Sequence, residues 1–154
     1  MLSVLELKMS PVMMTILLAV LMWFLARSTP AYAITPWLRF GVLLVFLGAG
    51  AAIGIAGVRA FHRAHTTVNP WRPHASSELV VSGIYQRTRN PMYLGLLLAL
   101  AGWGLYLANF YSLLLGFLFV PYMNRFQIRP EERALEQVFG EAFVEYCKRV
   151  RRWL

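Results

Sequence analysis

The sequence predicts an all-α membrane protein with about four transmembrane helices and an amphipathic cytoplasmic helix at its C-terminal end, all in one domain. Three observations support this fold class. Hydrophobic residues make up 58% of the 154 residues and charged residues only 14%, whereas soluble domains average about 45–50% and about 25%. Four long apolar stretches contain no charged residue. The lysines and arginines are divided very unequally between the segments that connect these stretches.

The four apolar stretches run from about residue 12 to 26, 40 to 58, 92 to 108 and 110 to 123. A helix needs about 20 residues to cross the ~30 Å hydrocarbon core of a bilayer. The second stretch meets this length alone, and the others need flanking residues. Because only Asn109 and its neighbours separate the last two stretches, we expect a tight helical hairpin. Gly50 and Gly54 in the second stretch indicate close helix packing rather than a dinucleotide-binding loop, which has to follow a strand.

Basic residues predict how the chain is oriented. With four spans, 13 of the 15 lysines and arginines fall on one side of the membrane, and Arg27 and Arg39 fall on the other. Cytoplasmic connections are rich in Lys and Arg, so we expect both termini and the 59–91 loop to be cytoplasmic, in a bacterial inner membrane. Residues 1–33 also resemble a signal peptide, but we expect this segment to be retained as the first span.

The segment that starts at Pro130 predicts an amphipathic helix. Apolar residues recur at three- and four-residue steps from Leu135 to Trp153, and charged residues occupy the opposite face. Pro130 suits the first position of a helix, and Glu131 and Glu132 suit its positive N-terminal end. The basic end of this helix is suited to anionic lipid headgroups.

The 59–91 loop is a candidate for chemistry, because loops longer than about 12–15 residues are usually functional or disordered. At its end, Asn90 and Pro91 suit the cap and the first position of the third helix. The N-terminus of that helix and the Arg89 guanidinium would form an anion site at the membrane surface. The alternative is that Arg89 only extends toward lipid headgroups and Asn90 only caps the helix.

Glu131 and Glu132 follow the fourth span, at the membrane level of Arg89 and Tyr93. Two adjacent carboxylates favour an ammonium or a sulfonium cation. The alternative is that they only compensate the dipole of the last helix. The three histidines do not predict a metal site, because the sequence has no Asp, one Cys and no cluster at ligand spacing.

The motifs resemble those of the integral-membrane methyltransferases that include isoprenylcysteine carboxyl methyltransferase and the phospholipid N-methyltransferases. That family has, in order, Gly-x-Tyr, Arg-His-Pro-x-Tyr-x-Gly, a helical hairpin, Glu-Glu-x-x-Leu, Phe-Gly, a Tyr and a basic end. The corresponding segments here lie between about residues 66 and 152 and are Gly83-Ile84-Tyr85, Arg89-Asn90-Pro91-Met92-Tyr93-Leu94-Gly95, Asn109, Glu131-Glu132-Arg133-Ala134-Leu135, Phe139-Gly140, Tyr146 and Val150-Arg151. Asn90 replaces the usual His, and Gln127 replaces an Arg of the isoprenylcysteine enzymes, which argues against a prenylcysteine carboxylate as substrate.

The resemblance implies methyl transfer from S-adenosyl-L-methionine, with S-adenosyl-L-homocysteine as product, to a lipophilic acceptor at the cytoplasmic interface. Arg89 would hold the cofactor's carboxylate, and Glu131 or Glu132 its ammonium. The expected catalytic residues are Glu132 and Arg129, with His74 or Glu132 as the base for an acceptor that loses a proton. The implied cofactor site consists of Tyr85, Arg89, Asn90, Pro91, Tyr93, Leu94, Gly95, Glu131 and Glu132.

A second interpretation is a small membrane scaffold whose basic loops bind anionic lipid or a protein partner. It explains the composition and the charge equally well, but it does not explain why the Arg89 and Glu131 motifs occur together in family order. We therefore expect an enzyme with membrane lipid as its partner and no nucleic acid. Binding of S-adenosyl-L-homocysteine to the folded protein distinguishes the two interpretations.

Overall fold

The computed structural model describes residues 9–64 and 79–154, and all regular elements in these ranges are helical. The first two helices, α1 (Pro11–Ser28) and α2 (Pro36–Arg63), each begin with a proline in the first turn, where a missing N–H costs no helical hydrogen bond. Both are long and apolar enough to cross a membrane. At 1.5 Å per residue the 18 residues of α1 rise about 27 Å, close to the thickness of a hydrocarbon core.

The third and fourth apolar stretches form the expected hairpin. The third stretch is α3 (Pro91–Tyr106), and the fourth is divided at Leu118 into α4 (Phe110–Phe117) and α5 (Phe119–Met123). With 16 residues, α3 is shorter than the two long helices. The all-α class is therefore confirmed, with two helices that could span a membrane, and the count of four spans stays a prediction.

Asn109 organises the turn of the hairpin. Its side-chain oxygen accepts a hydrogen bond from the Ser112 N–H at 2.9 Å and so caps α4. Its amide nitrogen donates to the Thr29 hydroxyl at 2.8 Å and to the Pro30 carbonyl at 2.9 Å. Ala108, just before it, has a positive φ of 49°, which turns the chain sharply between the helices. The turn is thereby fixed to the segment that joins α1 to α2.

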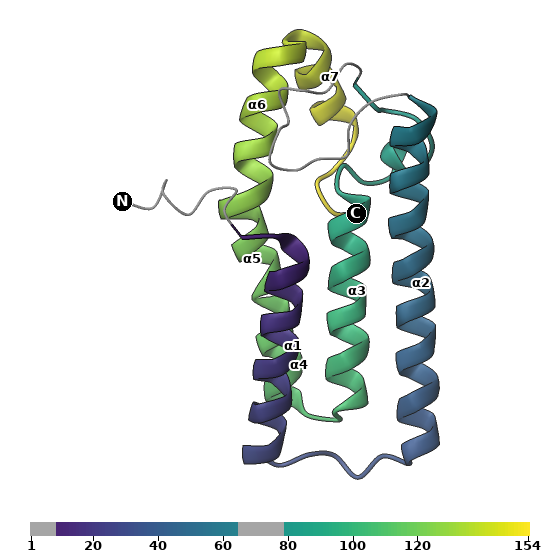
Figure 1. Cartoon of the computed structure of the whole chain (residues 1–154), viewed down its shortest axis with the longest axis vertical. Helices are drawn as coiled ribbons and strands as arrows, with labels where there is room; N and C mark the ends of the chain where they lie inside the picture. The colour runs from purple at the N-terminus through teal and green to yellow at the C-terminus, as the bar shows by residue number, and fades with distance from the viewer. Residues whose placement is uncertain (1–8, 65–78) are drawn as a thin grey trace.

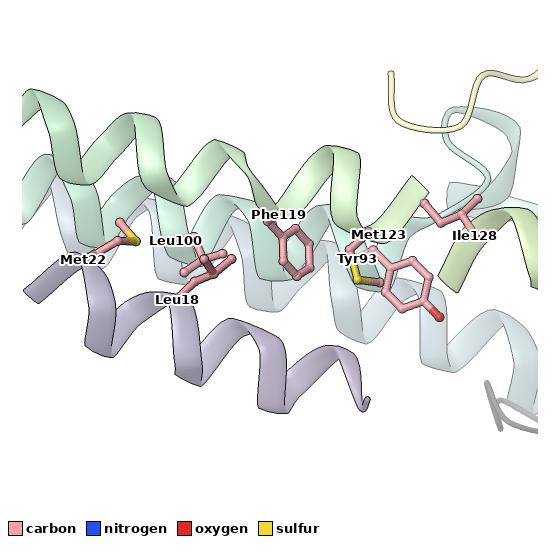
Figure 2. Close-up of a cluster of buried hydrophobic side chains, with 7 residues drawn as sticks. All are labelled: Leu18, Met22, Tyr93, Leu100, Phe119, Met123 and Ile128. Carbon is pink, nitrogen blue, oxygen red and sulfur yellow. The ribbon is translucent and has the colours of Figure 1, made fainter. Parts of the chain in front are cut away.

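The core lies where α3, α1 and the α4–α5 arm of the hairpin pack against one another, and α2 packs along the opposite side of α3 (Figure 1). Figure 2 shows the buried side chains following one another along the bundle from Met22 to Ile128. At the contact of α2 with α3, a Cβ atom built on Gly50 would lie 2.6 Å from the Gly95 carbonyl oxygen. This contact confirms close packing at Gly50, whereas a Cβ atom on Gly54 would meet nothing within 4 Å.

The C-terminal part differs from the single amphipathic helix that we predicted. It consists of a π-helical turn, η4 (Asn124–Ile128), then α6 (Arg129–Phe139) and α7 (Glu141–Arg149). Gly140, with a φ of +53°, separates α6 from α7. Helical backbone also continues from α5 through η4 into α6, so Pro130 does not follow a free helix start. The expected role of Glu131 and Glu132 in compensating a helix N-terminus therefore loses its structural basis.

The described basic residues lie at opposite ends of the bundle, as the charge pattern requires. Arg27 and Arg39 lie where α1 ends and α2 begins, and Arg89 lies at the end where α3 begins (Figure 1). Lys8 and Arg72, which contribute to the predicted asymmetry, are outside the described residues. The assignment of one end to the cytoplasm stays a prediction.

Candidate functional site

The segment before α3 is anchored to its neighbours by Tyr85. It lies in the short 3-10 helix η3 (Gly83–Gln86), which Gly83 opens with a φ of +62°. The Tyr85 ring is buried and packs edge-on against Phe61 of α2, with ring centroids 5.4 Å apart. Its carbonyl oxygen accepts a hydrogen bond of 2.7 Å from the Tyr146 hydroxyl of α7. Signature residues from both ends of the motif region are thus joined, and Arg89 is held at the start of α3.

Arg89 and Glu132 form an ion pair at 3.2 Å that joins the start of α3 to α6. Both side chains are largely buried, with exposed fractions of 13% and 18%. Arg89 Nη1 also donates to the Cys147 thiol of α7. Its Nε is buried without a hydrogen-bond partner among the described residues. A buried guanidinium that retains an unused donor is suited to a further anionic group.

Arg152 is a third charged member of this cluster, and we did not predict it. Its Nη2 lies 2.7 Å from Glu132 Oε2, and its Nε lies 2.9 Å from Oε1, so the pair is bidentate. The hydrogen bond to Glu132 raises the pKa of Arg152. One carboxylate therefore receives two guanidiniums, from Arg89 at the start of α3 and from Arg152 near the C-terminus.

Arg152 reaches the cluster because residues 150–154, which we call the C-terminal strap, turn back across the start of α3. The Arg89 N–H donates to the Arg151 carbonyl at 2.9 Å. The Thr88 hydroxyl and the Asn90 side-chain amide both donate to the Arg152 carbonyl, at 3.1 and 3.0 Å. The Trp153 indole N–H donates to the Asn124 side chain at 3.0 Å. The strap thus closes one side of the cluster.

Asn90 does not have the role that we expected. It occupies the position before α3, but its side chain makes no capping hydrogen bond and instead holds the strap through the Arg152 carbonyl. The Asn90 N–H donates a hydrogen bond of 3.2 Å to the Thr88 hydroxyl. Asn90 thus lies beside Arg89, as expected, but its side chain binds the strap and does not cap α3.

Beside the ion pairs, Glu131 forms a second polar group with two neutral donors. Its Oε1 accepts hydrogen bonds from the Tyr93 hydroxyl at 2.5 Å and from the Gln127 amide at 2.7 Å. Burial raises the pKa of Glu131 to about 7, helped by the nearby Glu132, although both hydrogen bonds act in the opposite direction. This site therefore holds a carboxyl group that changes charge near neutral pH.

The remaining predicted residues have packing roles or lie apart. Leu94 and Gly95 are buried on α3, and Gly95 faces Gly50 of α2 at close range. Pro91 is also buried, against Gly57 of α2. Arg129 is exposed at the start of α6 and makes no ion pair or hydrogen bond through its side chain within the described parts of the chain. The structure thus does not bring it into the cluster.

The histidines and metal ligands give no second site in the described ranges. Within residues 9–64 and 79–154, no three metal-ligating side chains come together. His65 and His74, the latter a predicted base, lie outside those ranges. The described cluster thus offers the side chains of two arginines, two glutamates and the buried tyrosines, together with Cys147 and Gln127.

Comparison with known proteins agrees with the resemblance that the motifs indicate. Residues 36–142 match the phospholipid methyltransferase family. An Arabidopsis thaliana protein named protein-S-isoprenylcysteine O-methyltransferase B is 33% identical over 115 residues, which are 73% of this chain and 56% of the relative. An uncharacterized protein of Haemophilus influenzae is 46% identical over 63 residues, which are 41% of this chain and the whole relative. No solved structure matches the chain.

Proposed function

The chain belongs to the phospholipid methyltransferase family, and from this we propose that it transfers a methyl group from S-adenosyl-L-methionine to a lipophilic acceptor at the membrane interface. One observation supports the proposal most. Tyr93 of α3 and Glu131 of α6, 38 residues apart in the sequence, meet at 2.5 Å, and Arg89 and Glu132 pair beside them. The two motifs of the family signature therefore form one cluster. The chain aligns with only about half of the Arabidopsis relative, so the proposal covers methyl transfer in general and not the specific activity in that relative's name.

The side chains of the cluster suit the groups of this cofactor. The buried and unpartnered Nε of Arg89 suits a carboxylate, and Glu132 holds that guanidinium in place through its ion pair. Tyr85 and Tyr93 are buried beside these charged groups and add aromatic walls to the cluster. The bound cofactor supplies an electrophilic methyl group on a sulfonium. The task of the protein is then to align the acceptor and to exclude water.

We assign the proton-accepting role to Glu131 rather than to the predicted Glu132. Glu132 is held by two guanidiniums, whereas the pKa of Glu131 is raised to about 7. A base is most effective when its pKa lies near the working pH. An amine or thiol acceptor would give its proton to Glu131, and a carboxylate acceptor would need no base.

A lipophilic acceptor fits the surroundings of the cluster. The long helices α1 and α2 expose many large apolar side chains, as helices facing lipid do. Gln127 stands where isoprenylcysteine enzymes have an arginine. It is buried, and its side-chain amide donates a hydrogen bond to Glu131. This neutral residue favours an acceptor other than a prenylcysteine carboxylate, such as a lipid amine.

Calorimetry with S-adenosyl-L-homocysteine on the detergent-purified full chain tests the cofactor assignment. Arg89→Ala and Glu132→Gln should each weaken binding about 100-fold, because removing one partner of a buried charge pair costs about 3 kcal/mol of binding free energy. Glu136→Gln, on the exposed face of the same helix, is the matched control and should bind like the wild type. Wild-type affinity in both folded site variants would refute the site, and no binding to the folded wild type would favour the scaffold.

A radiolabelled-methyl assay on total membrane lipid extract tests the acceptor. We expect the label in a product that partitions into organic solvent. Label only in protein or only in water-soluble molecules would refute the lipophilic acceptor and leave the cofactor assignment standing.

A further inference from the structure

A cavity lies at the end of the bundle remote from Arg89 and Glu132. It has a volume of about 700 Å³ and opens where α1 ends, α2 begins and α3 ends. Figure 1 shows α1 and α2 on either side of α3 and joined at this end, so that the end of α3 lies between them. The residues that line the cavity include Trp23, Arg27, Trp37, Arg39, Phe40 and Tyr106.

Two arginines face this cavity, and no acidic residue of the described ranges lies near them. All described glutamates lie between residues 131 and 145, at or beyond the other end of the bundle. The Arg27 guanidinium stacks over the Trp23 ring, 5.1 Å from its centroid, and has no hydrogen-bond partner in the described part of the chain. Arg39 makes one long hydrogen bond, 3.5 Å from Nη1 to the Tyr106 carbonyl. Most donors of both guanidiniums are therefore available to an anion.

The depth of the cavity identifies the kind of anion. Arg27 lies in the last turn of α1 and Arg39 in the first turn of α2, so both lie at the boundary of the hydrocarbon core. Trp and Tyr residues concentrate at this level of a membrane protein. Apolar side chains continue from the cavity along both helices, for example the exposed Phe24 and Leu44. An anion bound here would have hydrocarbon directly beside it, as the phosphate of a membrane lipid has.

We propose that this cavity binds the phosphate group of an anionic membrane lipid. Arg27 and Arg39 bind the phosphate, because guanidiniums present paired donors that match phosphate oxygens. The rings of Trp23 and Trp37 cover the glycerol region, and the acyl chains run along α1 and α2. This site is separate from the methyl-transfer cluster, so its test does not depend on the proposed function.

Native mass spectrometry of the full chain with phosphatidylglycerol tests the proposal. We expect one lipid to bind with at least tenfold higher affinity than phosphatidylcholine. The double substitution Arg27→Gln and Arg39→Gln should remove this preference. The charge-matched control, Arg59→Gln and Arg63→Gln at the other end of α2, should retain it. Equal weakening by both double variants would show general charge attraction and overturn the site.

Two further measurements keep the proposal falsifiable. Trp37 is 74% exposed, so Trp37→Ala should fold normally and weaken phosphatidylglycerol binding several-fold; unchanged binding would contradict the assigned cavity. Inorganic phosphate at the same concentration as the lipid should not compete. If it displaces phosphatidylglycerol, the site is one for free phosphate and the lipid assignment is wrong.

Discussion

Glu131 should make the folded protein less stable as the pH rises toward neutrality. Its carboxyl group ionises near 4.5 in an unfolded chain, whereas burial raises its pKa to about 7 in the folded protein. Between these two values the folded state keeps a proton that the unfolded state has lost. Each pH unit in this interval therefore lowers the free energy of unfolding by about 1.4 kcal/mol, and the full interval by about 3–4 kcal/mol. The contribution is constant below pH 4.5 and again above pH 7.

The substitution Glu131→Gln isolates the contribution of Glu131 to the pH dependence of the free energy of unfolding. Glutamine has nearly the same shape and its carbonyl oxygen can still accept the Tyr93 hydrogen bond. The variant should gain stability relative to the wild type as the pH is raised from about 4.5 to 7. The measurement is the free energy of unfolding in detergent at a series of pH values, followed by circular dichroism. Taking the difference between the two proteins cancels the titration of all groups that they share.

Glu136→Gln provides the control, because Glu136 is exposed on the same helix. Its stability curve should run parallel to that of the wild type. Tyr93→Phe removes a donor that lowers the pKa of Glu131, so its curve should continue to fall to higher pH than the wild-type curve. If Glu131→Gln also runs parallel to the wild type between pH 4.5 and 7, then Glu131 is not buried as described and cannot be the base.

Three other predictions concern stability and are checked by the melting temperature in detergent. Gly50→Ala should cost about 1–3 kcal/mol, because its Cβ atom would lie 2.6 Å from a backbone oxygen of α3, whereas Gly54→Ala should be neutral or stabilising. Asn109→Ala should cost about 2–4 kcal/mol, since it removes a cap and two hydrogen bonds at a residue that is 2% exposed. Arg152→Gln should cost about 1–2 kcal/mol by releasing the strap from Glu132, and Arg149→Gln, which is exposed, should cost nothing measurable. The close contact at Gly50 would be contradicted if Gly54→Ala lowered the melting temperature as much as Gly50→Ala. The Asn109 hydrogen bonds would be contradicted if Asn109→Ala melted like the wild type. The contact of the strap with Glu132 would be contradicted if both arginine variants lost equal stability.

The helices of the bundle could be predicted from the sequence because hydropathy reports burial in lipid directly. The apolar stretches locate α1, α2 and the hairpin, but they do not show the division of the fourth stretch at Leu118, and the helix ends differ. For example, the second apolar stretch covers residues 40–58, whereas α2 spans Pro36–Arg63. Helical backbone continues through the polar residues at both ends, and hydropathy carries no information about backbone there.

Apolar periodicity could not separate α6 from α7. The apolar positions continue in step on both sides of Gly140, so they predict one helix, although the chain reverses there with a positive φ. Glycine was the available signal, because it is the residue that most readily takes this conformation at a helix end. The reversal matters for the site, since it returns Tyr146 and Arg152 to the start of α3.

The members of the candidate site were predicted to different degrees. Order along the chain was enough to predict that Arg89 and Tyr93 meet Glu131 and Glu132. Arg152 was missed because its partner depends on the path of the strap, which is set by hydrogen bonds of main-chain carbonyls. Main-chain contacts leave no pattern of residue types in a sequence.

The energetics of Glu131 favour an active site over a scaffold at this end of the bundle. A scaffold would gain stability at neutral pH from a glutamine at this position, since glutamine keeps the polar contacts and carries no charge to bury. The carboxyl group that stands there instead weakens the fold in the pH range where it would act as a base. Carboxyl groups that cost stability and have a raised pKa concentrate at sites of proton transfer. Burial raises the pKa of Glu131, and the same burial keeps water away from the cluster, as methyl transfer requires. One structural feature therefore accounts for the raised pKa and for the exclusion of water.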